Sequence, residues 1–285
     1  MRLRAGRQER FAALRPRTGA GRPSRRWFHC RRLPSGSTYL RWAGLFEFLV
    51  SADGRDIQFH RLPRATLESL SAYLLGQVLS FSLLAFGVEP LHGTVVVVDG
   101  EAIGFLGDCG YGKSTLGAAF LRLGFPILTD DLMVLARTPS GYAVQPGMPR
   151  IKLFPAVSRP VLGAVRPGGG PRLNDGTTKQ ILPLGAGQAF GRSAPLRALY
   201  ALREPGPAPR RAPTRIEIEP LTAGGALLEL LGSSFNTIVT DRERLARQFG
   251  FASRLAAAVP VRRLGYPRNL SKLPAVCEAV LADLP

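Results

Sequence analysis

The segment Gly104–Thr115, with the sequence GFLGDCGYGKST, has the residue types and spacing of a phosphate-binding loop. Within it, Gly107 to Ser114 fit the pattern G-x-x-x-x-G-K-[ST] without a gap. Glycines allow positive φ, so that backbone N–H groups can turn inward around phosphate oxygens, and the N-terminus of a following helix adds partial positive charge. The residues predicted to bind a nucleotide are Gly107, Asp108, Cys109, Gly110, Tyr111, Gly112, Lys113, Ser114 and Thr115.

Lys113 and Ser114 give this loop its specific chemistry. In a loop of this pattern the lysine bridges the β- and γ-phosphates and the serine hydroxyl ligates Mg²⁺. The sequence therefore predicts ATP and Mg²⁺ as ligands. Cys109 is interpreted as a small residue within the loop, whereas Tyr111 either packs over the phosphates or faces solvent.

Two adjacent aspartates, Asp130 and Asp131, follow Lys113 by seventeen and eighteen residues. This is about where the neighbouring strand of a phosphate-loop core delivers its acid. Two carboxylates allow a division of labour, in which one holds the metal and the other takes a hydroxyl proton during phosphoryl transfer. In the alternative interpretation, one carboxylate serves the metal and the other caps the following turn.

The elements that must position these residues can be read around the loop. Residues 94–108 form two β-rich runs broken at Asp99-Gly100, and the second run leads directly into the loop. A helix then begins near Lys113 and ends at Gly124, and residues 125–136 form a strand that carries the aspartates. This order of strand, loop, helix and strand predicts an α/β core.

The flanking segments predict a smaller N-terminal unit and a helical C-terminal part. Residues 37–62 read as strands around a turn at Ala52-Asp53-Gly54. The apolar run Leu70–Val88 is long enough to span a bilayer, but its serines, glycines and glutamine favour a buried helix. Residues 139–220 are rich in glycine and proline, with short strands, and the chain after them is mostly helical with one short strand near residues 261–266.

Composition argues against several classes of function. The chain of 285 residues has a formal charge of +18, but Met1–Arg32 alone holds eleven arginines against one acid. Only four basic residues are lysine, a bias that a GC-rich coding sequence produces, and no nucleic-acid motif accompanies the charge. The three cysteines have neither metal nor redox spacing, so a reduced, cytoplasmic protein without a metal cluster is expected. The basic start is interpreted as a disordered tail or an upstream start codon, with a transit peptide as the alternative.

The loop, the helix and the aspartate pair together resemble the catalytic C-terminal domain of the HPr kinase/phosphorylase family. That family's pattern begins with a histidine-glycine pair, and here His92-Gly93 stands fifteen residues before Gly107. The match continues through GDCGYGKS, with Cys109 in place of serine, to Gly124 and the pair Asp130-Asp131. The family's later E-x-R-G signature is absent, and residues 146–155 stand in its place. The whole chain looks more like the broader group of HPr kinase-like serine kinases.

The resemblance implies an ATP-dependent kinase that phosphorylates a hydroxyl of a protein or peptide. The implied fold is α/β, with a phosphate-loop core of the HPr kinase type over residues 91–285. The residue patterns before it predict a small α+β unit over 37–90 and a basic disordered tail over 1–36. The catalytic candidates are Asp130, Asp131, His92 and Lys113, and the metal is assigned to Ser114 and Asp131.

Three further basic residues are candidates for stabilising transition-state charge: Arg150, Lys152 and Lys179. The alternative is that they are solvated bases beside strands. The competing functions are a nucleotide switch or weak ATPase without a hydroxyl acceptor, a kinase of a small metabolite, and a nucleic-acid protein that relies on the arginine tail. No stable membrane span is expected. A homo-oligomer is kept open because the resembled enzymes are hexamers.

Overall fold

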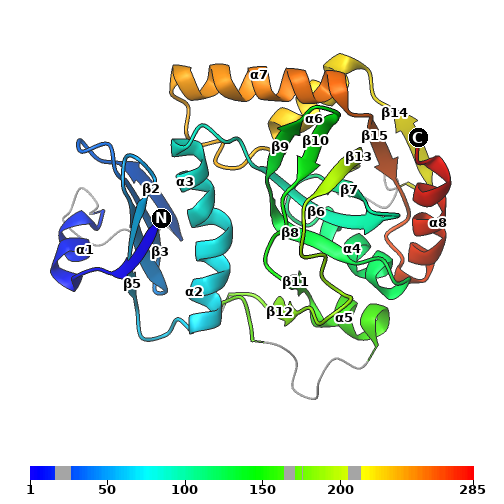
Figure 1. Ribbon diagram of the computed structural model, residues 1–285. Helices are drawn as coiled ribbons and strands as arrows, with labels where there is room; N and C mark the ends of the chain where they lie inside the picture. Colours follow the sequence, from blue (N-terminus) through cyan, green and yellow to red (C-terminus); the bar gives the residue numbers. More distant parts are fainter. Residues whose placement is uncertain (17–26, 164–170, 175, 205–212) are drawn as a thin grey trace. The chain divides into compact units, whose positions relative to one another are not determined.

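The computed structural model describes residues 1–16, 27–163, 171–174, 176–204 and 213–285 (Figure 1). The chain divides into two compact units, Met1–Val88 and Glu89–Pro285. Both contain helices and sheets, so the predicted mixed α/β architecture is confirmed in this general sense.

The first unit is built on a five-stranded sheet in the order β1-β5-β4-β3-β2. All neighbours are antiparallel except β1 and β5, which are parallel. The predicted turn at Gly54 joins β4 to β5, with Gly54 at φ +69°. The elements are β1 (Arg2–Ala5), α1 (Gln8–Leu14), β2 (Phe28–Arg32), β3 (Thr38–Trp42), β4 (Phe46–Val50) and β5 (Asp56–Arg61).

The expected disordered tail over residues 1–36 is wrong for the part that the structure describes. Strand β1 adds to the sheet beside β5, and Phe11 of α1 is fully buried. The arginines find carboxylate partners, since Arg4 pairs with Asp56 at 2.7 Å and Arg15 with Glu47 at 2.8 Å. Composition alone concealed this order because each partner lies more than thirty positions away in sequence. Residues 17–26 lie outside the described residues.

The apolar run is helical from Leu67 to Ala85, as α2 (Leu67–Tyr73), a π-helical stretch (Leu74–Val78) and α3 (Leu79–Ala85). The hydroxyl of Thr66 caps its start by accepting from the N–H of Ser69. The ring of Tyr73 packs against Trp42 and Phe46 of the sheet. Within the described residues this is the one helix long and apolar enough to cross a membrane, and half of it is buried. That is weak evidence for a span, because core helices of soluble proteins pass the same test.

The second unit has a mixed sheet in the order β14-β15-β13-β7-β6-β8. Strands β7, β13 and β15 are parallel, whereas β6 is antiparallel to both of its neighbours, β7 and β8. The strand that carries the aspartates is therefore not the neighbour of the loop strand, as the sequence suggested, because β6 lies between them. The strands of this sheet are β6 (Leu91–Val98), β7 (Glu101–Leu106), β8 (Ile127–Met133), β13 (Ala194–Leu202), β14 (Glu217–Pro220) and β15 (Val261–Gly265).

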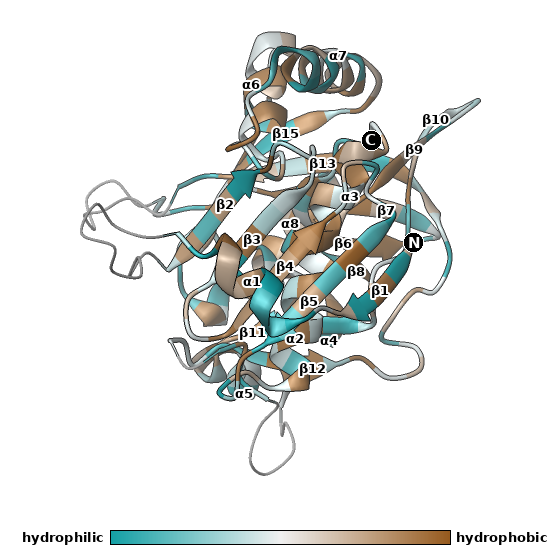
Figure 2. Ribbon diagram, turned by 90° about the vertical axis from the view of Figure 1, so that its left-hand side faces the viewer, coloured by the Kyte–Doolittle hydropathy of each residue, from teal (hydrophilic) through white to brown (hydrophobic). Residues whose placement is uncertain are grey.

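Helices cover both faces of this sheet (Figure 1). Val96 and Val98 of β6 belong to the core on the side of α4 and α8, and Val95 and Val97 to the core on the side of α6 and α7. Burial on both faces explains the continuous valine run, which is brown in Figure 2. The helices are α4 (Lys113–Arg122), α5 (Pro155–Leu162), α6 (Ala223–Gly232), α7 (Arg242–Ala258) and α8 (Leu273–Asp283), and the remaining strands are β9 (Leu135–Thr138), β10 (Gly141–Val144), β11 (Arg150–Leu153) and β12 (Gln180–Pro183).

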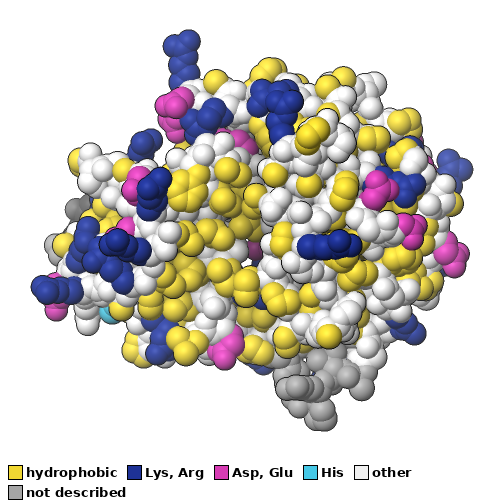
Figure 3. Space-filling model, viewed as in Figure 1, with side chains coloured by type: hydrophobic (Ala, Val, Ile, Leu, Met, Phe, Trp, Pro, Cys, Tyr) yellow, Lys and Arg dark blue, Asp and Glu magenta, His cyan; other side chains and the backbone are white. Residues whose placement is uncertain are grey.

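Charge on the visible face of this unit is dispersed. In Figure 3 its Lys and Arg side chains stand singly among apolar, neutral and acidic ones, without forming a continuous basic patch there.

Candidate functional site

The glycine-rich loop joins the end of β7 at Leu106 to the start of α4 at Lys113. Gly107, Gly110 and Gly112 have φ values of +137°, +86° and +91°. A side chain at any of these positions would strain the backbone. Tyr111 packs against the start of the loop, where a Cβ on Gly107 would lie 2.9 Å from its ring, and Asp108 accepts a 2.6 Å hydrogen bond from the N–H of Cys109.

Lys113 is the buried cation of the loop. Its Nζ donates to the carbonyl oxygens of Gly107 at 2.6 Å and Asp108 at 2.9 Å. Burial lowers the pKa of Lys113, while the nearby Asp130 and Asp131 act in the opposite direction. Since both direct acceptors are neutral, the ammonium group has charge to offer an anion at the loop.

Asp130 is held by hydrogen bonds from three elements. Its Oδ1 accepts from the hydroxyls of Ser114 and Thr94, each at 2.7 Å, and its Oδ2 accepts from the N–H of Lys152 at 2.9 Å. These contacts fix the carboxylate against the first turn of α4. A serine hydroxyl and a carboxylate oxygen so close together form the oxygen pair that Mg²⁺ takes in nucleotide sites.

Asp131 pairs with two basic side chains, one of them that of Lys152, which meets Asp130 only through its backbone N–H. Its Oδ2 lies 2.7 Å from Nζ of Lys152, and its Oδ1 lies 3.4 Å from Nε2 of His92. Burial alone would raise the pKa of Asp131, but Lys152 and His92 outweigh it and hold that pKa far below its usual range. Its φ of +103° is rare for a residue other than glycine, and strain of this kind is concentrated at functional sites.

The register of the sheet brings these residues to the loop. Gly93 lies opposite Leu106 of β7 on one side and Asp131 of β8 on the other. Thr94 likewise pairs with both Phe105 and Asp130. Leu106, Gly93 and Asp131 therefore lie side by side in one row across β7, β6 and β8, and Leu106 is the last residue of β7 before the loop. His92 is the next residue of β6 beyond this row.

The structure brings together most of the predicted candidates. Asp130, Asp131, His92, Lys113 and Ser114 converge as described, with Lys152 as the basic partner of Asp131. Of the other two basic candidates, Arg150 is part-buried, and burial lowers its pKa while both aspartates oppose this. Lys179 lies over the ring of Phe154, 5.8 Å from its centroid.

Sequence reasoning missed a second contributor to the loop, the segment after β15. Arg268 donates from Nη1 to the carbonyl oxygen of Tyr111 and from Nη2 to the carbonyl oxygen of Arg203 at 2.9 Å. Its guanidinium also stands 4.9 Å from the ring centroid of Tyr266. A Cβ on Gly112 would lie 2.6 Å from Nη1 of Arg268. No local pattern marks this contact, because Tyr111 and Arg268 are 157 positions apart.

The side-chain groups of this site that suit a metal ion are oxygen donors. Among the described residues there is no group of three or more His, Cys, Asp or Glu side chains placed to hold a metal ion. A magnesium ion bound with a nucleotide does not need one, since it keeps several waters and uses one or two protein ligands with the phosphates. The Ser114–Asp130 pair fits that requirement.

Comparison with known proteins gives limited information. No protein-family profile matches the sequence, and no curated protein does either. Among solved structures, the chain is similar to the Hpr(Ser) kinase/phosphatase from Coxiella burnetii, with a TM-score of 0.35 and 12% identity over 68% of this chain and 88% of that chain. At this level the likeness is a distant one of fold alone.

Proposed function

We propose that this protein is an ATP-dependent phosphotransferase that moves the γ-phosphoryl group of Mg-ATP to a hydroxyl of a protein or peptide. The observation that carries the proposal is the separation of the two adjacent carboxylates. Asp130 is bonded to Ser114 of the loop, whereas Asp131 faces His92 and Lys152. A site that only holds a nucleotide needs Asp130 and Ser114, the first set. It has no use for the second set, which is Asp131 with His92 and Lys152.

The first set binds the nucleotide. Loop N–H groups and Lys113 hold the phosphates, and Ser114 and Asp130 hold magnesium, which neutralises charge on the phosphates when bound. The sequence assigned the metal to Ser114 and Asp131, but the 2.7 Å bond from Ser114 favours Asp130 as the metal carboxylate.

The second set handles the acceptor. Asp131, which is ionised at neutral pH as an aspartate ordinarily is, accepts the proton of the acceptor hydroxyl. That oxygen forms a bond to the γ-phosphorus while the bond to the bridging oxygen of ADP breaks. His92 and Lys152 hold the carboxylate in place, and the positive charge of Lys152 stands beside the transferring group.

The test uses purified protein, Mg²⁺ and γ-labelled ATP, with labelled protein and peptide fractions of a cell extract as the readout. We expect Asp131→Asn to bind ATP as the unaltered protein does and to lose transfer. Asp130→Asn should lose the magnesium dependence of ATP binding. Glu278→Gln, which removes the same charge from an exposed position on α8, is the matched control and should leave both intact.

Two results would contradict the proposal. If label is released only as inorganic phosphate, with no acceptor, the site is that of a weak ATPase or nucleotide switch. If Asp131→Asn transfers label as fast as the control, Asp131 is not the base.

A further inference from the structure

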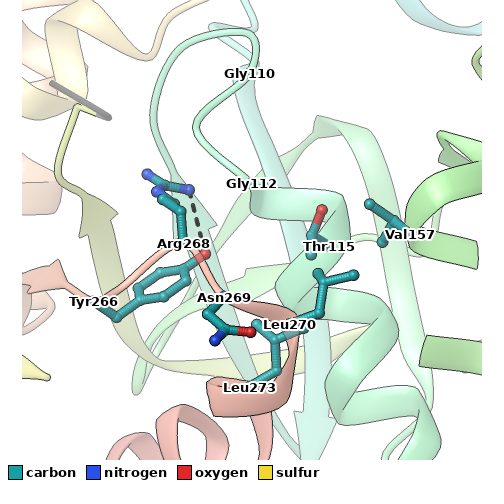
Figure 4. A pocket seen from close by; sticks show the side chains of 9 residues that line it. All are labelled: Gly110, Gly112, Thr115, Val157, Tyr266, Arg268, Asn269, Leu270 and Leu273. Carbon is teal, nitrogen blue, oxygen red and sulfur yellow. Dashed lines mark hydrogen bonds between the residues drawn. The ribbon is translucent and has the colours of Figure 1, made fainter. Parts of the chain in front are cut away.

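A pocket of about 190 Å³ opens beside the loop and the first turn of α4 (Figure 4). In the view of Figure 4, Tyr266, Arg268 and Asn269 stand on one side and Thr115 and Val157 on the other. Its lining residues are Gly110, Gly112, Thr115, Val157, Tyr266, Arg268, Asn269, Leu270 and Leu273. The sequence predicted Gly110, Gly112 and Thr115 as nucleotide-binding residues, but it assigned no role to the residues that the segment after β15 adds to this pocket.

We propose that this pocket takes the base of the nucleotide, and that it accepts a purine without selecting adenine over guanine. The inference rests on the proposed function, since it requires that the loop bind the phosphates. It goes further in assigning a base subsite to the segment after β15 and in stating what that subsite can read.

The position of the pocket is the first argument. It shares Gly110, Gly112 and Thr115 with the loop and the helix start, and Thr115 directly follows the metal-binding Ser114. A nucleotide with its phosphates on the loop therefore has this pocket within reach of its other end. Sites for whole drug-sized ligands measure about 300–1,000 Å³, so a cavity of 190 Å³ suits one ring system.

The walls suit a flat aromatic ring. Leu273 and Tyr266 are almost fully buried, and Val157 and Leu270 add further apolar surface. Stacking on an aromatic side chain is tolerant of base identity, because every base has a π-face. A bicyclic purine covers more of these walls than a single pyrimidine ring, so purines gain more from the same pocket.

Asn269 decides what the pocket can read on the base edge. Its Oδ1 accepts from the N–H and from the hydroxyl of Ser271, both at 3.0 Å. A backbone N–H can only donate, so the atom facing it is the oxygen, and the amide orientation is fixed. With both lone pairs of Oδ1 used, Asn269 offers a ligand only the N–H donors of Nδ2.

At the edge of the base that carries N7 and position 6, a donor alone cannot select adenine over guanine. Adenine and guanine share the N7 acceptor, and they differ at position 6, where adenine carries a donor and guanine an acceptor. An amide reads adenine when its oxygen also accepts from the amino group. That oxygen is occupied here by Ser271, so Asn269 can donate to N7 of either purine or to the position-6 oxygen of guanine, and adenine gains nothing over guanine at this edge.

The experiment measures binding by calorimetry to the full chain with Mg²⁺, using non-hydrolysable analogues of ATP, GTP, CTP and UTP together with inorganic triphosphate. We expect the GTP analogue to bind at least about as tightly as the ATP analogue, and the pyrimidines and triphosphate to bind more weakly than either purine analogue by about tenfold or more. Asn269→Asp should weaken both purines alike and leave triphosphate unchanged. Lys272→Met, which makes the same change in net charge at an exposed position nearby, is the control and should bind all five ligands normally.

The outcomes separate this inference from the proposed function. If triphosphate binds as tightly as the purine analogues, or if the ATP analogue binds at least about tenfold tighter than the GTP analogue, the inference is wrong while the loop keeps its role. If none of the five ligands binds, both are wrong. Comparison of the analogues on the unaltered protein decides the matter even if Asn269→Asp does not fold.

Discussion

The contact between Arg268 and the loop leads to a prediction about two neighbouring glycines. Gly110 and Gly112 have nearly the same positive φ, +86° and +91°. Around Gly110 there is open space, whereas a Cβ on Gly112 would lie 2.6 Å from Nη1 of Arg268 and 2.9 Å from the hydroxyl of Tyr266. Alanine at the two sites therefore adds the same backbone strain, but only at Gly112 does it displace a side chain.

The magnitudes follow from these two terms. Alanine at positive φ costs about 1–2 kcal/mol, and the reduced entropy of the unfolded chain returns about 0.4–1 kcal/mol. We therefore expect Gly110→Ala to lower the free energy of unfolding by about 1 kcal/mol. Gly112→Ala should also lose the two hydrogen bonds of Arg268 to the backbone carbonyl oxygens of Tyr111 and Arg203, at about 1 kcal/mol each for an exposed group, which gives about 3 kcal/mol in total.

The assay is urea unfolding at neutral pH, followed by far-ultraviolet circular dichroism because both tryptophans, Trp27 and Trp42, lie in the first unit, together with calorimetric binding of Mg-ATP. Arg268→Ala alone should cost about 2 kcal/mol through the same two hydrogen bonds. Because Gly112→Ala already loses them, the double variant should be about 2 kcal/mol more stable than the sum of the single effects predicts. Affinity for Mg-ATP should fall more for Gly112→Ala than for Gly110→Ala.

Two outcomes would refute this reasoning. One is equal loss of stability for the two glycine variants, within about 0.5 kcal/mol, which is the usual error of such comparisons. The other is strict additivity of Gly112→Ala and Arg268→Ala, which would mean that Arg268 does not hold the loop.

Three further predictions concern the loop and the two aspartates. Cys109 is exposed in the loop, whereas burial raises the pKa of the Cys30 thiol to about 11 and that of the Cys277 thiol to about 12. A maleimide at neutral pH should therefore modify Cys109 first. Saturating Mg-ATP should slow that reaction, and an unchanged rate would place the nucleotide elsewhere. Lys152→Met should lower the free energy of unfolding at pH 7 by about 2 kcal/mol, because it leaves Asp131 without its main cation. The lowered pKa of Asp131 adds stability that is fully present above the unfolded pKa of about 3.9 and is lost as pH falls below it. The free energy of unfolding should therefore fall more steeply with decreasing pH for the unaltered protein than for Lys152→Met. Parallel pH curves for the two proteins would contradict the ion pair. Thr94→Val should cost about 1 kcal/mol of stability and weaken Mg-ATP binding, since Asp130 loses one of its two hydroxyl donors. Unaltered binding would show that Ser114 alone fixes the carboxylate.

The features that the sequence predicted well depend on neighbours in sequence. The loop, its flanking strand and helix, and the Asp99-Gly100 turn are each specified by a few consecutive residues. Asp99 and Gly100 have φ values of +51° and +84°, as a two-residue hairpin turn requires. Short-range backbone chemistry of this kind can be read without a structure.

The features that were missed depend on partners far apart in the chain. The N-terminal arginines looked disordered because Asp56 and Glu47, which pair with them, lie in later strands. Arg268 carried no signal for the same reason. The two aspartates posed a different difficulty. They are the same residue type at adjacent positions, and only the strand geometry, which directs their side chains differently, gives them different partners.

The spacing between His92-Gly93 and the loop has a structural meaning that the sequence alone did not reveal. The two-residue turn at Asp99-Gly100 fixes the β6–β7 hairpin, so that Val98 pairs with Glu101 and Gly93 with Leu106. Continued by one residue, the same register sets His92 opposite Gly107, where the loop begins.

Strand β8 then pairs with the other edge of β6 and carries Asp131 to the same row. A side chain on Gly93, in the centre of that row, would come within 3.1 Å of the carbonyl oxygen of Phe105 and 3.2 Å of Leu106. Glycine at this position keeps β6 and β7 close. The antiparallel strand β6 pairs with both β7 and β8, and its register aligns the loop with Asp131. The fifteen-residue interval between His92 and Gly107 is therefore the length of a hairpin, and a change in that length would separate the glycine-rich loop from His92 and Asp131.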